Sequence, residues 1–118
     1  MHINDNHWIV SIYKEKKLIM YDSMGNENLK IGRKLCDLLE SQLKVENIKI
    51  SSLKTKIQNN TYDCGIFSML FMLAEAGNLS VDINQEHATE YRFIIKNILL
   101  EQINFNKREL ERYFFSLI

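Results

Sequence analysis

The stretch QNNTYDCGIFSMLFML, residues 58–73, changes from polar to apolar at a single cysteine, and this change decides the fold. The residues before Cys64 are rich in Asn, Thr and Asp, which favours a loop. The segment that begins at Cys64, CGIFSMLFMLAEAG, is apolar on nearly every face, as is typical of a central buried helix with Gly77 as its expected stop. We therefore expect Cys64 at the N-terminus of a buried helix.

A thiol at this position has two interpretations. In the first it is a small buried hydrophobe, as most intracellular cysteines are, and Cys36, in an amphipathic segment next to Leu35, fits this interpretation. In the second, the unpaired N–H groups and the dipole of the helix N-terminus stabilise a thiolate, which is the nucleophilic form. A nearby imidazole, acting as a base or as a charged partner, would favour the second interpretation.

Two strands upstream offer such an imidazole. The segments HWIVSIY (7–13) and LIMYD (18–22) are rich in β-branched and aromatic residues, and the polar KEKK between them predicts a hairpin. Because the start of the first strand and the end of the second lie at the same end of a hairpin, His7 and Asp22 are expected side by side. The carboxylate would then hold one imidazole tautomer and stabilise the charged ring.

The rest of the chain predicts further helices around this hairpin. Apolar residues at helical spacing indicate an amphipathic helix over 29–45, and the alternation in NIKISSL indicates a strand over 47–53. Asn84 is the expected cap of a helix over 85–104, and a short final helix is expected over 107–117. No repeat, linker or low-complexity tract separates these elements, so residues 1–118 are expected to form a single domain.

The composition argues against several classes of function. The 118 residues carry 15 basic and 15 acidic side chains, so no charge imbalance points to nucleic acid or a membrane surface as partner. No apolar run is long enough to span a membrane, and the N-terminus does not resemble a signal peptide. Two cysteines without short spacing indicate a reducing intracellular location, in the nucleus or the cytoplasm. No His, Cys or acidic residues have metal-ligand spacing, and no cofactor is expected.

Two further side chains are candidates for the site. Gln58 precedes Cys64 by six residues in the loop, where its amide and the backbone N–H of Cys64 would donate to a developing oxyanion. Trp8 follows His7, and its interpretation from the residues alone is core or rim packing of a strand. Neither residue is informative alone, but together with His7 and Asp22 they form a workable catalytic geometry.

These motifs carry a family resemblance. HW at the start of a strand, YDS after the next strand, and Gln58 with Asp-Cys-Gly in QNNTYDCGIF resemble the catalytic half of the ubiquitin-like-protein-specific (SUMO or sentrin) cysteine proteases, which share the fold of the adenovirus endopeptidases. The tail ATEYRFIIKNILLEQI resembles their Arg-containing helix, and the resemblance covers about residues 6–102. It implies an α+β fold with a papain-like, adenain-type core: a small mixed sheet, a central buried nucleophile helix and flanking helices.

The resemblance also implies a role for each matched residue. Cys64 would be the nucleophile, His7 the general base and Asp22 its orienting carboxylate. Gln58 would be the oxyanion donor, and Trp8 would bind substrate by lying over its Gly-Gly tail. The implied reaction is cleavage after Gly-Gly of a SUMO-like or other ubiquitin-like modifier, so the expected partners are that modifier and its conjugates.

One departure from the family leaves alternatives open. Its N-terminal helical half is missing, since Met1 lies six residues before His7. The chain would then be a fragment, a split enzyme completed by another chain, or a compact member, with an exposed apolar patch. Two other functions stay open: a truncated, non-catalytic relative that binds a modifier or another protein, and an acetyltransferase of the same fold. The acetyltransferase ranks lower because such enzymes favour Glu at the position of Asp22.

Overall fold

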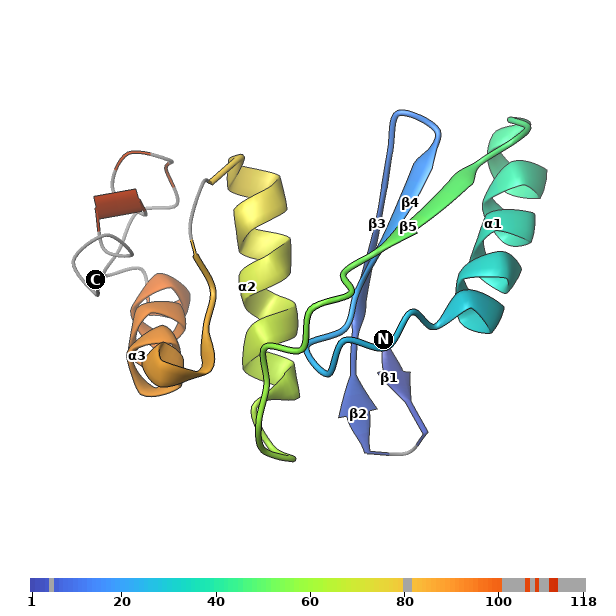
Figure 1. Ribbon diagram of the computed structural model, residues 1–118. Helices are drawn as coiled ribbons and strands as arrows, with labels where there is room; N and C mark the ends of the chain where they lie inside the picture. The colour runs from blue at the N-terminus through green and yellow to red at the C-terminus, as the bar shows by residue number, and fades with distance from the viewer. Residues whose placement is uncertain (5, 80–81, 101–105, 107, 109–110, 113–118) are drawn as a thin grey trace.

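The computed structural model describes residues 1–4, 6–79, 82–100, 106, 108 and 111–112 (Figure 1). A short antiparallel pair, β1 (His2–Ile3) and β2 (His7–Trp8), precedes a sheet of β3 (Val10–Lys14), β4 (Lys17–Tyr21) and β5 (Lys49–Ser52). The helices are α1 (Leu29–Leu43), α2 (Cys64–Gly77) and α3 (Ala88–Leu99), with a 3₁₀ turn, η1 (Gln85–His87), before α3. Because β4 pairs antiparallel with β3 and parallel with β5, the sheet is mixed and the architecture is α+β.

The β3–β4 hairpin positions Asp22, which follows β4 directly, whereas His7 lies on β2, outside the hairpin. Glu15 and Lys16 connect its strands with positive φ angles of 52° and 58°, as the favoured two-residue hairpin turn requires. The single strand expected over 7–13 is wrong at Ile9, whose N–H donates to the carbonyl O of Met1 (2.8 Å). The chain divides there because β2 pairs with β1, whereas β3 pairs with β4.

Alternating residues of the sheet face two helical layers, α1 on one side and α2 with α3 on the other (Figure 1). Leu18 and Met20 of β4 are buried against α1, in a cluster that also holds Cys36. On the opposite face, Val10 packs with Phe67 of α2 and with the apolar side of α3. Cys36 is thus a buried hydrophobe of the α1 layer, and α2 lies between the sheet and α3.

Helix α2 starts at Cys64 and ends at Gly77, as the sequence predicts. Asp63 occupies the N-cap position, and the N–H of Phe67 donates to its carbonyl O (3.1 Å). Asn78, rather than Gly77, takes the left-handed conformation that closes the helix (φ 50°). Gly77 lies inside the last turn, where an added Cβ would come within 3.1 Å of the Leu79 side chain. Its small size lets the chain fold back over the helix end.

The helix expected over 85–104 begins later than the sequence suggests. Asn84 occupies the expected N-cap position before Gln85, but it caps η1, makes no side-chain cap hydrogen bond, and the α-helical part starts at Ala88. Positions 101–104 and most of the final helix expected over 107–117 lie outside the described residues. Within the described part of the chain, no helix is long and apolar enough to cross a membrane.

Candidate active site

An imidazole and a buried carboxylate meet at one end of the sheet. His7 Nε2 lies 2.7 Å from Asp22 Oδ1, and the Asp22 side chain is fully buried whereas His7 is partly exposed. Asp22 Oδ1 also accepts the N–H of Met24 (2.8 Å), and Oδ2 accepts Asn28 Nδ2 (2.8 Å). The contact expected from the hairpin is present, and the loop after β4 wraps the carboxylate. No sequence signal had pointed to Asn28.

The loop around Asp22 depends on a glycine. The N–H of Gly25 donates to the carbonyl O of Asp22 (2.9 Å), which closes a turn directly after β4. Gly25 has a φ of +78°, and a Cβ added there would lie 2.9 Å from the backbone N of Lys56. Any side chain would therefore strain the backbone and push this loop away from its neighbour.

The surroundings of Asp22 fix the tautomer of His7. Burial alone would raise the pKa of the Asp22 carboxyl, but hydrogen bonds from His7, Asn28 and the Met24 N–H outweigh burial and hold that pKa below its usual value. At neutral pH the carboxylate is ionised and can only accept hydrogen bonds. His7 Nε2 therefore carries the hydrogen, and the neutral ring presents Nδ1 as its basic lone pair.

Cys64 is the first residue of α2, at the end of the helix that contacts β2. This packing brings Trp8 close to Gly65, since a Cβ added at Gly65 would lie 3.9 Å from Trp8 Cδ1. Trp8 follows His7 in the chain, and Gly65 follows Cys64. Cys64 is only 5% exposed, and none of the hydrogen bonds among the described residues involves its Sγ. The fold thus places His7 and Cys64 on contacting elements without a direct bond between them.

The first turn of α2 keeps its backbone donors free of side-chain caps. Asp63 makes no cap hydrogen bond, although it occupies the N-cap position. Its Oδ1 instead accepts Arg92 Nη2 (2.6 Å), and its Oδ2 accepts Asn60 Nδ2 (2.7 Å) and Gln85 Nε2 (2.9 Å). The N–H groups beside Cys64 are therefore available to an anion, which the helix dipole also favours.

The Asp63 carboxylate ties the loop before α2 to α3. Burial would raise the pKa of Asp63, but hydrogen bonds from Arg92, Asn60 and Gln85 outweigh it, so the pKa lies below its usual value and Asp63 is ionised at neutral pH. Arg92 and Gln85 follow Asp63 by 29 and 22 residues, and no spacing rule connects them. The only sequence signal for Arg92 was the resemblance of the tail segment to an Arg-containing helix.

Gln58 is buried, and its amide is engaged in the loop before α2. Its Oε1 accepts the hydroxyl of Ser23 (2.6 Å), and its Nε2 donates to the carbonyl O (2.7 Å) and to Oδ1 (3.2 Å) of Asn60. Both amide hydrogens therefore have acceptors, and the amide offers no free donor in this conformation. An oxyanion role for Gln58 requires release of its contact with Asn60, whereas the backbone N–H groups of α2 need no such change.

Trp8 lies at the surface beside the N-terminal end of α2. Its side chain is 49% exposed, and its ring centroid is 4.8 Å from that of His2. It also lines a cavity of about 390 Å³ that follows α2. A half-exposed ring at the rim of a strand and on a cavity wall excludes core packing of Trp8, and it leaves rim packing and contact with a substrate both open.

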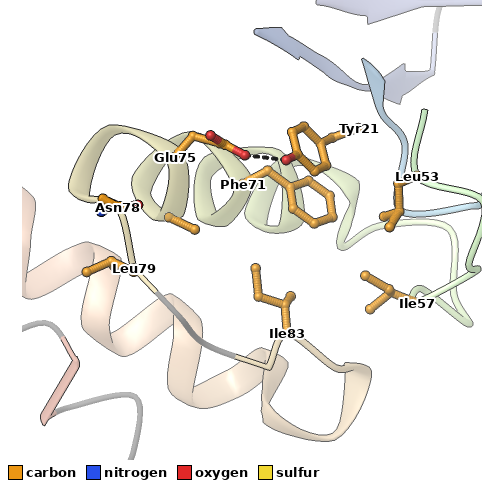
Figure 2. A pocket seen from close by; sticks show the side chains of 9 residues that line it. Tyr21, Leu53, Ile57, Phe71, Glu75, Asn78, Leu79 and Ile83 are labelled. Atoms are coloured by element: carbon orange, nitrogen blue, oxygen red, sulfur yellow. Dashed lines mark hydrogen bonds between the residues drawn. The ribbon is translucent and has the colours of Figure 1, made fainter. Parts of the chain in front are cut away.

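A second cavity, of about 310 Å³, lies between α2 and the segments that precede α2 and α3 (Figure 2). Tyr21, the residue before Asp22, donates its hydroxyl to Glu75 at this cavity, and its ring stacks on Phe71 with centroids 4.8 Å apart. Burial and the Glu75 carboxylate raise the pKa of Tyr21, so the phenol stays protonated. The contact holds the end of β4 against α2, and with it the position of Asp22.

A thiol at the start of a buried helix, with a His–Asp pair near the end of an adjacent strand, is an arrangement that papain-like cysteine enzymes use. The chain belongs to the YopJ serine/threonine acetyltransferase family, whose family model matches residues 2–113. This family lies in the superfamily of the SUMO proteases and adenain, so the superfamily expected from the motifs is confirmed, whereas a SUMO-specific family is not what matches.

No curated protein and no solved structure matches the chain significantly. Among the described residues, no group of three or more His, Cys, Asp or Glu side chains is placed to hold a metal ion.

Proposed function

We propose that the chain is a cysteine-dependent acetyltransferase that moves an acetyl group from a thioester donor to a serine or threonine hydroxyl of a protein. The observation that carries this proposal is the family match over residues 2–113, which includes His7, Asp22 and Cys64. Asp in place of Glu at position 22 is no obstacle, because the loop after β4 brings the shorter carboxylate within 2.7 Å of the imidazole.

The chemistry runs in two halves through Cys64. Its Sγ attacks the carbonyl carbon of the donor thioester while His7 takes the thiol proton, and the donor's carbon–sulfur bond breaks as its thiol leaves with that proton. The acceptor hydroxyl then gives its proton to His7 and attacks the acetyl carbon, and Cys64 leaves and regains the proton. Asp22 accepts the Nε2–H throughout and stabilises each imidazolium.

Two features of the chain support this use of Cys64. The uncapped N–H groups at the start of α2 are donors for the negative charge that develops on the acetyl oxygen in both halves. Cys36 and Cys64 are both free thiols, and a catalytic thiol must stay reduced. We therefore place the activity in a reducing compartment, the nucleus or the cytoplasm.

Incubation with acetyl-coenzyme A tests the proposal. Intact-mass spectrometry should show one acetyl group on the chain, released by hydroxylamine as a thioester is, and absent from Cys64→Ala. Cys36→Ala is the matched control and should be acetylated like the unmodified chain, since Cys36 is buried in the α1 layer. A folded chain that never carries an acetyl thioester, with the Cys36→Ala protein equally inert, would contradict the proposal.

A second candidate is cleavage after Gly-Gly of a ubiquitin-like modifier. It is favoured by the half-exposed Trp8 beside His7, because a ring over a narrow slot selects residues without side chains. The same thiol would form an acyl-enzyme with the modifier, and water would take the place of the acceptor hydroxyl. The partners would be the modifier and its conjugates, with a complementing chain as a further partner.

An alkylating probe built on a modifier C-terminus separates the two candidates. Labelling of Cys64 by this probe, without acetylation by acetyl-coenzyme A, would establish the peptidase and exclude the transferase. Modifier binding without either modification, and unchanged by Cys64→Ser, would identify a non-catalytic relative instead.

A further inference from the structure

The cavity beside Trp8 runs along one face of the nucleophile helix. On α2 its lining residues are Gly65, Ser68, Met69 and Met72, which are spaced as one helical stripe. Met72 follows Gly65 by seven positions, so the cavity extends about 10 Å from the Cys64 end toward the middle of α2. Trp8, Ile9 and Val10 form the opposite wall, and Met1 completes the lining. Its volume of about 390 Å³ is in the range of small-molecule sites.

The polarity of this cavity changes along its length. Ser68 is one turn from Cys64 and 7% exposed, and its hydroxyl has no hydrogen-bond partner among the described residues. The Trp8 indole, the other polar group of the lining side chains, stands next to His7. Away from this end the walls are the side chains of Met69, Met72 and Val10, and no ionisable side chain lines the cavity. A ligand with a polar head toward Cys64 and an apolar tail toward Met72 matches this order.

We propose that this cavity holds the alkyl chain of an acyl group longer than acetyl, bound through its carbonyl to Cys64. The inference rests on the proposed acyltransferase function and names its donor class, the thioesters of medium-chain carboxylic acids. The bond changes are those of the acetyl reaction: Cys64 Sγ bonds to the acyl carbon, the donor carbon–sulfur bond breaks, and the donor thiol leaves with the proton from His7. The free Ser68 hydroxyl faces the polar end of the bound acyl group.

The chemistry of the walls favours an alkyl chain over the small acetyl group. The methyl group of an acetyl would leave most of the cavity unfilled, and the apolar walls of the cavity would stay in contact with water. Methionine side chains are flexible and adapt to chains of different length. Each methylene group that moves from water into such a site should increase the binding affinity about fourfold.

A series of straight-chain acyl-coenzyme A donors, from acetyl to octanoyl, tests the inference on the unmodified chain. The measured quantity is kcat/KM for acylation of Cys64, followed by release of the free thiol and by intact mass. It should rise about fourfold per methylene until the chain fills the cavity. A flat or falling series beyond acetyl would overturn the inference and leave the proposed transferase intact, whereas no acylation by any donor would overturn the transferase itself.

A pair of variants locates the effect. Met72→Glu places a charge at the far end of the cavity and should abolish the preference for octanoyl over acetyl. Met72 is 45% exposed, so the chain should still fold. Leu38→Glu, a matched change at an exposed leucine of α1, should leave the octanoyl-to-acetyl ratio unchanged. Equal ratios in Met72→Glu and the unmodified chain would place the alkyl chain elsewhere.

Discussion

At the scale of single residues, Asp22 controls the imidazole. It is the only partner that fixes the His7 tautomer among the described hydrogen bonds, and its other contacts come from donors, Asn28 Nδ2 and the Met24 N–H. In Asp22→Asn, the new amide nitrogen would face one of these donors, and His7 would no longer be held with Nδ1 as its base. We expect the single-turnover rate of Cys64 acylation to fall by about a thousandfold or more.

The pH dependence of stability provides a second readout of Asp22→Asn. Because hydrogen bonds hold the folded-state pKa of Asp22 below its usual value, the carboxylate stabilises the fold above the usual pKa. This contribution is lost as pH falls through the folded-state pKa. At pH 7 the variant should be less stable by about 2 kcal/mol, and the difference should shrink in acid. Urea titrations at neutral and acidic pH would contradict this if the difference stayed constant or grew.

At the scale of elements, α3 holds the start of α2 through the ion pair between Arg92 and Asp63. Arg92 Nη2 lies 2.6 Å from the buried Asp63, although the Arg92 side chain is itself 50% exposed. Arg92→Met leaves the carboxylate without its cation and should cost about 2 kcal/mol, less than for a fully buried pair because solvent screens the exposed guanidinium. Arg92→Lys keeps the charge and should recover part of the loss. Chemical denaturation measures both.

A matched arginine supplies the control for this pair. Arg33 of α1 forms no ion pair among the described residues, so Arg33→Met should change the free energy of unfolding by less than about 0.5 kcal/mol. If Arg92→Met and Arg33→Met had the same effect, the link between α3 and the loop before α2 would not contribute to stability.

The elements also show which features local sequence determines. The start of α2 at Cys64 was predictable because a polar loop meets an apolar run there. The His7–Asp22 contact was predicted from a hairpin and is present, although His7 lies on β2, outside the hairpin strands. The break at Ile9 was not predictable, because it depends on a bond to Met1 within an otherwise strand-like segment. The same holds for Gln58, whose amide oxygen accepts the Ser23 hydroxyl from another loop.

At the scale of the whole molecule, large apolar side chains are exposed on the two helices that lie on one side of the sheet. They are Met69 and Met72 on α2, and Phe93 and Leu99 on α3. The chain has no net charge at pH 7, so no overall repulsion opposes contact between copies. Exposed apolar surface of this kind favours association with another protein or with a second copy.

Sedimentation velocity over a range of concentrations tests this expectation. The unmodified chain should sediment faster as its concentration rises and should bind a hydrophobic dye, because burying Met69 and Phe93 against another surface removes apolar area from water. The double variant Met69→Glu with Phe93→Glu should remain monomeric, since association would then bury unpaired charges. Leu38→Glu removes an equally exposed apolar side chain on α1 and should not change the association. A monodisperse monomer that binds no dye at any concentration would contradict this expectation. It would show that these exposed side chains do not form a contact surface.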